Sequence, residues 1–282
     1  MPWPVPALAR AAWAQLPDSA AQQALIGVAR QFWNVPQGAQ VVVAPGVSAI
    51  IARLPAVLEG ARVHIPAPTY SEHAAAFAAH GWQVDSTPTA PQGPVQARVV
   101  VHPNNPTGHL WEWQDLRGVP VVVDESFCDV APEKSLVAHA GAQAIILKSF
   151  GKFWGLAGLR LGFAIMGASH AHRLCQLLGP WPVSGPALAI ATRALSDSTW
   201  AEQTRHRLRR AALRLDRLMT RQRVRLIGGC DLFRLYETED ARAWQERLAQ
   251  HYILCRIFRD SPRLLRLGLP PPGRWQQLQA AL

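Results

Sequence analysis

The chain has 282 residues and a mass of 30.9 kDa, with 49% hydrophobic and 17% charged residues. These figures exclude a disordered, collagen-like or coiled-coil protein and fit one large or two modest globular domains. The formal net charge is +10, which raises the possibility of nucleic-acid binding. However, no known nucleic-acid-binding motif accompanies this charge, and many of the arginines crowd the helical stretch 205–225, as on a solvated helix face. We therefore expect no nucleic-acid partner.

The cysteines and the apolar segments indicate where the protein resides. The four cysteines are far apart and lack metal-ligand spacing: Cys128, Cys175, Cys230 and Cys255. Such cysteines are typical of free core thiols in a reducing compartment, so we expect no metal site. The first residues carry no signal segment, and every apolar run is too short to span a membrane. The sequence thus predicts a cytoplasmic protein without a membrane partner.

In chain order, short β-branched runs alternate with helical patterns up to about residue 149. Helices are expected over residues 20–33, 48–58 and 72–80, and strands over 41–43, 62–65, 82–85, 99–101, 121–123 and 144–147. This alternation predicts an α/β fold with a mostly parallel central sheet sandwiched by helices.

After about residue 187 the pattern changes. One long helix is expected up to residue 221, and it is followed by strands at 223–227, 232–236 and 264–267 and a helix at 240–251. We therefore expect a large domain of residues 34–187 and a smaller α+β C-terminal domain of residues 188–282, which part of residues 1–33 joins.

Polar side chains follow five of the expected strands: Ser48, Tyr70, Asn105, Asp124 and Ser149. In parallel sheets, ligands bind at the carboxyl ends of the strands. A carboxylate at the end of a buried strand needs a cation, and a protonated pyridine nitrogen would be one. We therefore expect these side chains to form a ligand site.

The segment SFGKFWGLAGLRLG, residues 149–162, carries the most specific chemistry. A lysine in such a glycine-rich, aromatic setting is partly desolvated, which lowers its pKa and makes the Lys152 amine a candidate nucleophile. Ser149 and Arg160 offer a hydroxyl and a guanidinium suited to a phosphate. On its own, the segment also fits a loop lysine beside a structural arginine.

Together with NNPTG at 104–108, this segment resembles the fold-type I pyridoxal-phosphate enzymes of the aspartate aminotransferase superfamily, in the histidinol-phosphate aminotransferase branch. With PTYSEH at 68–73 and LRLGLP at 265–270, it is most similar to the threonine-phosphate decarboxylases of cobalamin synthesis. The resemblance covers nearly the whole chain. It implies a homodimer with pyridoxal 5′-phosphate as its cofactor.

The resemblance also implies roles for single residues. Lys152 would bind the cofactor covalently, Asp124 would pair with the pyridine nitrogen, and Asn105 would bond the 3′ oxygen. Tyr70 would stack on the ring. The phosphate would be held by Ser149, Arg160 and the backbone amides of Val47 and Ser48 at a helix N-terminus. Arg266 matches the arginine that binds the substrate carboxylate, and Arg256 matches, less closely, a position facing a distal phosphate.

The activity that the resemblance implies is decarboxylation of O-phospho-L-threonine to an aminopropanol phosphate. The first alternative is transamination of histidinol phosphate or another amino acid on the same scaffold. The second is a catalytically impaired partner protein that keeps the cofactor pocket, which is motivated by a short N-terminal arm and by Phe127 in place of a common tyrosine. No catalytic role is expected for His73, and Glu125 is expected only to cap or pair locally.

Overall fold

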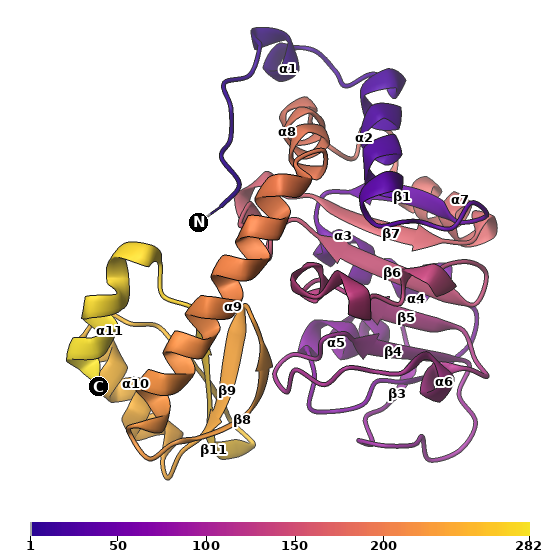
Figure 1. The fold of residues 1–282 in the computed structure, drawn as a ribbon. Coiled ribbons are helices and arrows are strands. Elements are labelled where there is room, and N and C mark those ends of the chain that lie inside the picture. Colours follow the sequence, from indigo (N-terminus) through magenta and orange to yellow (C-terminus); the bar gives the residue numbers. More distant parts are fainter. Residues whose placement is uncertain (1) are drawn as a thin grey trace.

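The structure, a computed structural model, describes residues 2–282 and contains the predicted mostly parallel sheet between layers of helices (Figure 1). The strand order is β1-β7-β6-β5-β4-β2-β3. The strands are β1 (Gln40–Ala44), β2 (Arg62–His64), β3 (Gln83–Asp85), β4 (Ala97–Val101), β5 (Val121–Asp124), β6 (Ala144–Ser149) and β7 (Gly162–Met166). The sequence did not indicate β7, which pairs antiparallel with both β1 and β6.

Both faces of this sheet are buried, because successive strand residues point to opposite sides. On one side, Val42, Val122 and Ile145 pack under α3 (Val47–Ile51), α4 (Leu54–Val57), α5 (Ser71–Ala79) and α7 (Ala168–Leu178). On the other side, Val43, Val123 and Ile146 pack under α2 (Ser19–Phe32), α8 (Gly185–Leu195) and the start of α9 (Ser198–Thr220). The short helices α1 (Arg10–Ala14) and α6 (Trp113–Leu116) lie at the periphery (Figure 1).

The expected single helix from residue 187 to 221 is wrong. The chain leaves the helix at Ser196 and starts α9 at Ser198. Asp197 is the cause, because its side chain accepts a hydrogen bond from the Trp200 amide at 3.0 Å and so caps a new helix. The same carboxylate also accepts the Trp3 indole N–H at 3.1 Å.

A second, antiparallel sheet of four strands, in the order β10-β11-β9-β8, lies beside the first (Figure 1). It consists of β8 (Arg225–Cys230), β9 (Phe233–Glu237), β10 (Arg256–Phe258) and β11 (Ser261–Gly268). Its core packs against the second half of α9, α10 (Ala241–Gln250) and α11 (Trp275–Ala281) through Leu215, Leu248 and Trp275.

The N-terminal segment packs with the large sheet. Leu25, Ala29 and Trp33 belong to the same apolar core as β5 and β6. The division into domains of residues 34–187 and 188–282 stays a prediction. No helix within residues 2–282 is long and apolar enough to cross a membrane.

The two sheets meet backbone to backbone. The Gly229 amide donates to the Thr107 carbonyl oxygen at 3.0 Å. A Cβ on Gly108 would lie 2.1 Å from the Gly229 oxygen, and one on Gly228 would lie 2.0 Å from the Thr107 oxygen. Only glycine fits there, so the loop that carries Asn105 lies directly on β8.

Candidate active site

A pocket opens at the carboxyl ends of β4, β5 and β6. It is lined by all eight residues that were expected to bind a cofactor: Val47, Ser48, Tyr70, Asn105, Asp124, Ser149, Lys152 and Arg160. The space inside it, including the part that is open to solvent, is about 680 Å³. Residues from five separate segments thus converge, as the positions of the strand ends predicted.

Asp124 forms the negative end of the pocket. Its carboxylate is 3% exposed and interacts with His73 Nε2 at 2.9 Å, with the Ser126 amide at 3.0 Å and with Ser126 Oγ at 2.5 Å. Burial alone would raise the Asp124 pKa, but the bonds from His73 and Ser126 outweigh burial and lower it. Asp124 is therefore an anion poised for a cationic ligand atom.

His73 is the residue that the sequence did not reveal. It is fully buried in α5, and its Nδ1 has no hydrogen-bond partner among residues 2–282. Its position three residues after Tyr70 puts both rings on one side of the helix start, with centroids 6.1 Å apart. The spacing between Tyr70 and His73 was the only sign in the sequence that His73 lies near the site. It becomes informative only when the structure shows Asp124 beside His73.

Lys152 lies in the loop that follows β6. It is exposed and lines the pocket, and its Nζ lies 5.3 Å from the centroid of the Phe127 ring. Desolvation by the surrounding protein lowers the Lys152 pKa. The charge of Asp124 raises this pKa, whereas the charges of Arg266 and Arg160 lower it further. A lowered pKa leaves more of the amine unprotonated and nucleophilic at neutral pH.

Lys148, the nearest other lysine, does not compete for this role. It is 1% exposed and its Nζ lies 2.5 Å from Glu125 Oε2. It points away from the pocket, because it lies on the opposite face of β6 from Ser149.

Cationic and N–H groups form the end of the pocket opposite Asp124. Gly46 has φ +88° and precedes α3, whose first residue is Val47. A Cβ on Gly46 would lie 2.7 Å from Arg160 Nη2, so the absence of a side chain lets the guanidinium lie against the backbone. The first amides of a helix have no intrahelical acceptor. Together with Ser149, these donors suit a phosphate.

Neither of the two expected substrate arginines lines the pocket, and only Arg266 contacts one of its lining residues. Arg266 donates through Nη1 to Asn105 Oδ1, and its guanidinium carbon lies 5.4 Å from the centroid of the Phe233 ring. Burial and the nearby Arg256 lower the Arg266 pKa. Arg256 is exposed and faces Arg266 across the β10–β11 pair. None of the ion pairs within residues 2–282 involves Arg256.

A cluster near the pocket resembles a metal site in composition only. His102, Glu125 and Cys128 bring possible ligand atoms within 4.8 Å of one another. However, His102 Nδ1 accepts from the Trp111 amide at 3.0 Å and Nε2 donates to the Lys134 carbonyl oxygen at 2.8 Å. Neither ring nitrogen is left for a metal, and Glu125 is engaged by Lys148.

The pocket therefore has an anion at one end, phosphate-type donors at the other, and a lysine amine beside them. This arrangement suits a flat ligand that carries a basic ring nitrogen, a carbonyl group and a phosphate.

Comparison with known proteins agrees with this chemistry. The family model "Aminotransferase class I and II" matches residues 7–271. The chain is 38% identical to a threonine-phosphate decarboxylase of Pseudomonas aeruginosa, across 100% of this chain and 88% of that protein. It is 37% identical to a threonine-phosphate decarboxylase of a Sinorhizobium species, across 96% of this chain and 84% of that protein.

Solved structures share the fold at low identity. A histidinol-phosphate aminotransferase from Sinorhizobium meliloti in complex with pyridoxal-5′-phosphate has a TM-score of 0.85 at 18% identity and covers 97% of this chain and 83% of its own. An L-threonine-O-3-phosphate decarboxylase from Porphyromonas gingivalis has a TM-score of 0.78 at 18% identity and covers 96% of this chain and 93% of its own. At such identities the likeness concerns the fold alone.

Proposed function

The chain belongs to the class I and II aminotransferase family, and from that premise we propose that it decarboxylates O-phospho-L-threonine to an aminopropanol phosphate, with pyridoxal 5′-phosphate as its cofactor. The observation that carries this proposal is the identity of 37–38% to two threonine-phosphate decarboxylases over nearly the whole chain. The reaction would serve cobalamin synthesis, as the sequence resemblance implied.

The pocket fits the cofactor. Arg160, Ser149 and the backbone amides of Val47 and Ser48 would hold its phosphate, and the missing side chain at Gly46 leaves room for the Arg160 guanidinium. Asp124, kept ionised by His73 and Ser126, would pair with the protonated pyridine nitrogen. Lys152 would bind the cofactor covalently. When bound, pyridoxal phosphate supplies an electron sink for the pair left behind when a bond to the substrate Cα breaks.

The remaining pocket residues orient and shield. Tyr70 would cover one face of the ring and exclude water. Asn105 accepts from Arg266 through Oδ1, so its Nδ2 is the group that would donate to the 3′ oxygen. Because Asn105 would contact both Arg266 and the cofactor, it would fix the position of the substrate-binding arginine relative to the cofactor. The family commonly has a tyrosine at the position of Phe127, and phenylalanine has no hydroxyl. Asn105 would therefore be the side chain that binds the 3′ oxygen without help from residue 127.

The paired arginines support a substrate with two anionic ends. Arg266 would take the carboxylate, for which a guanidinium fork is suited, and Arg256 would take the distal phosphate. In this enzyme class the protein selects which Cα bond breaks by where it anchors the carboxylate. The position of Arg266 beside Asn105 would therefore decide between loss of CO₂ and loss of a proton.

Transamination is the second candidate function, because the family model and several structural neighbours are aminotransferases. A catalytically impaired partner protein is disfavoured, since all eight expected cofactor residues line one pocket. To distinguish these functions, the purified protein is incubated with pyridoxal phosphate and O-phosphothreonine, and CO₂ is followed with and without a keto acid. We expect CO₂ release that needs no keto acid and is absent from Lys152→Ala. Turnover that depends on a keto acid would establish the transaminase instead.

Recognition of the phosphate has its own test. Arg256→Ala should raise the KM for O-phosphothreonine about tenfold or more, since hydrogen bonds to charged groups contribute about 1.5–3 kcal/mol. Slow reaction with threonine should stay nearly unchanged, whereas Arg266→Ala should damage both reactions. Equal damage to both substrates by Arg256→Ala would make this residue structural.

We also propose a homodimer, as family membership implies. The well-exposed large apolar side chains of the single chain include Trp13 at 70%, Leu16 at 69% and Trp181 at 58%. A subunit interface would account for such exposure. Light scattering should give twice the chain mass of 30.9 kDa, and a monomer at all concentrations would contradict the proposal. The cytoplasmic location stays a prediction, which cell fractionation tests.

A further inference from the structure

Behind the pocket, on the opposite face of β5 and β6, lies a buried group of charged side chains that the proposed reaction does not use. Lys148 Nζ is 2.5 Å from Glu125 Oε2 and 3.6 Å from Asp129 Oδ1. Their exposed fractions are 1% for Lys148, 1% for Glu125 and 4% for Asp129. Charged side chains are almost never buried to this extent unless they are paired.

The Glu125 end of the group is fully bonded. Glu125 accepts from the Leu136 amide at 2.5 Å and from Ser135 Oγ at 2.6 Å. Burial alone would lower the Lys148 pKa, but Glu125 and Asp129 outweigh burial and raise it. Lys148 therefore stays charged, and it faces two carboxylates with a single positive charge.

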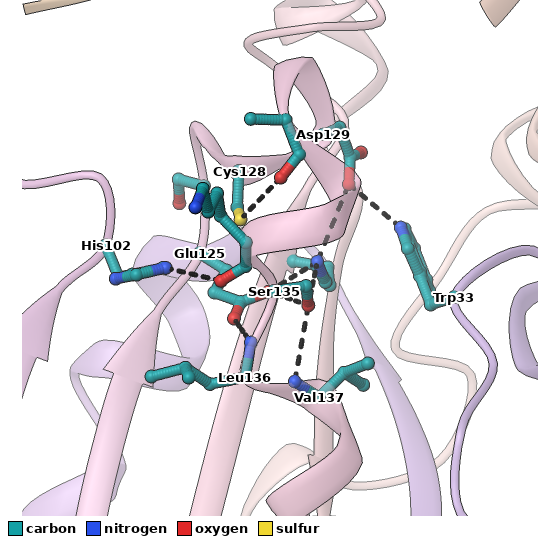
Figure 2. A network of polar contacts seen from close by, with 12 residues as sticks. Trp33, His102, Glu125, Cys128, Asp129, Ser135, Leu136 and Val137 are labelled. Carbon is teal, nitrogen blue, oxygen red and sulfur yellow. Dashed lines mark hydrogen bonds and ion pairs between the residues drawn. The ribbon is translucent and has the colours of Figure 1, made fainter. Parts of the chain in front are cut away.

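Asp129 takes its remaining hydrogen bonds from two tryptophans. Its Oδ1 accepts from Trp33 Nε1 at 2.9 Å, and its Oδ2 accepts from Trp154 Nε1 at 3.1 Å. Figure 2 shows Trp33 pointing at the Asp129 carboxylate, with Glu125 in the same interior. Trp33 directly follows α2, whereas Trp154 lies two residues beyond Lys152 in the same loop. One carboxylate thus holds the loop that carries the reactive amine.

The Trp154 ring is itself fixed. It is 0% exposed and stacks between Phe150 and Trp200, with centroid distances of 5.1 Å and 5.3 Å. The indole N–H therefore has one direction in which to donate, and Asp129 lies there. The network also adjoins the pocket along the backbone, because Glu125 follows Asp124 and Lys148 precedes Ser149.

We propose that Asp129 is a positioning residue for Lys152. Through the Trp154 N–H it fixes the loop at residues 150–156, so that the lysine amine is held in the pocket beside Asp124. Glu125 and Lys148 fix Asp129 in turn. This inference rests on the proposed role of Lys152 as the residue that binds the cofactor.

The structure supplies a matched pair of variants. Trp154→Phe and Trp33→Phe each remove one N–H donor from the same carboxylate and keep an aromatic ring, and both residues are buried, at 0% and 5% exposed. A purely structural network predicts similar losses of stability and similar effects on the site. Positioning through Trp154 predicts that only Trp154→Phe affects Lys152.

The readout that does not need turnover is the pH dependence of Lys152 labelling by an amine-reactive reagent in the protein without cofactor, followed by peptide mapping. Asp124, Arg160 and Arg266 are the charged groups that act on this amine. Trp154→Phe should loosen the loop, hydrate the amine and move the labelling midpoint upward. Its kcat should fall roughly ten- to a hundredfold at a nearly unchanged KM, as displacement of a reacting group by about 1 Å does. Trp33→Phe should leave the midpoint and kcat unchanged.

Equal midpoints in the two variants would overturn the proposal, whether both shift or neither does. Asp129→Ala, which removes the acceptor of the Trp154 N–H, provides a second route if Trp154→Phe does not fold, and an unshifted midpoint in that variant would overturn the proposal as well. Where both fold, the labelling midpoint of the double variant Asp129→Ala with Trp154→Phe should shift no further than that of the more affected single variant, because both changes remove the Trp154–Asp129 hydrogen bond. Additive effects would contradict it. Since labelling requires neither cofactor nor O-phosphothreonine, a failure here is distinct from failure of the proposed decarboxylation.

Discussion

Two lysines four residues apart, at the end of β6 and in the loop that follows, meet opposite environments. Lys148 is 1% exposed, yet its pKa is raised, because Glu125 and Asp129 surround it. Lys152 is exposed and lines the pocket, yet its pKa is lowered, because desolvation and two arginines outweigh Asp124. The more deeply buried lysine therefore keeps its proton more firmly. The balance between desolvation and partner charges, and not the depth of burial alone, determines which lysine can act as a nucleophile.

The same division extends to the two faces of β5 and β6. On the pocket face, Asp124 and Ser149 present groups that await a ligand. On the other face, Glu125 and Lys148 satisfy each other. Changes on the first face should therefore affect catalysis directly, whereas changes at Glu125 and Lys148 should affect stability first and the site only through Asp129 and Trp154.

The largest expected effect is that of Lys152→Ala. This variant should lose covalent cofactor binding and all turnover while it keeps its stability, because Asp124 retains its bonds to His73 and Ser126. Borohydride reduction of the loaded wild-type protein followed by peptide mapping should label Lys152. Label on Lys148 would reverse the assignment of the two lysines.

Asp124→Ala should reduce kcat strongly and weaken cofactor binding much less, because the phosphate is held at the other end of the pocket. Loss of one partner of a buried charge pair costs about 2–5 kcal/mol, which corresponds to roughly 30- to 4,000-fold in rate. Steady-state kinetics and a cofactor titration separate the two effects. A variant with a near-normal rate would remove Asp124 from the mechanism.

Lys148→Met should act on stability instead. It leaves two buried carboxylates without their cation, and breaking such a pair costs about 3–5 kcal/mol of unfolding free energy. Denaturant unfolding measures this loss, and the cofactor should still attach to Lys152. The double variant Lys148→Met with Glu125→Gln is the matched control and should regain part of the loss, because it removes one of the stranded charges.

The difference in unfolding free energy between the wild type and Lys148→Met should depend on pH in one direction. Because folding raises the Lys148 pKa, its contribution is complete below the ordinary lysine pKa of 10.5 and is lost as the pH rises toward the folded value. The stability gap between wild type and Lys148→Met should therefore be constant near neutral pH and narrow only in strongly alkaline solution. A gap that narrows between pH 6 and 9 would point to a different titrating group.

The smallest expected effect is a shift of a labelling curve. In the wild-type protein without cofactor, an amine-reactive reagent should modify Lys152 with a pH midpoint below the ordinary lysine value of 10.5. Lys148 should stay unmodified until the protein unfolds. Modification of both lysines with the same midpoint would abolish the contrast between them.

The sequence predicted the pocket better than it predicted what supports the pocket. Runs such as Val121-Val-Val indicate buried strands, and in a parallel sheet their ends must converge, so Asp124, Asn105 and Lys152 could be grouped before any coordinates. The 149–162 segment then supplied the chemistry. These predictions hold because the position of each such residue depends only on the strand or turn to which it belongs.

The supporting contacts could not be predicted, because they join distant parts of the chain. Trp33 and Asp129 are 96 residues apart, and His73 and Asp124 are 51 apart. No local pattern distinguishes a histidine that will face a carboxylate from one that will not. The helix break at Asp197 was missed for a related reason: an aspartate inside a helical pattern becomes a cap only where the chain has cause to turn.

The glycine contact between the two sheets has a consequence for which molecules can be accepted. Gly108 lies against the backbone of Gly229, and Gly228 lies against the backbone of Thr107. Main-chain atoms therefore set the distance between the pocket and Arg266. A side chain can rotate to make room for a longer substrate, but a peptide backbone that is held by a hydrogen bond cannot move aside in this way. We therefore expect an alanine at either glycine to push the two backbones apart and to move Arg266 away from the pocket, which would change the length of substrate that fits between them.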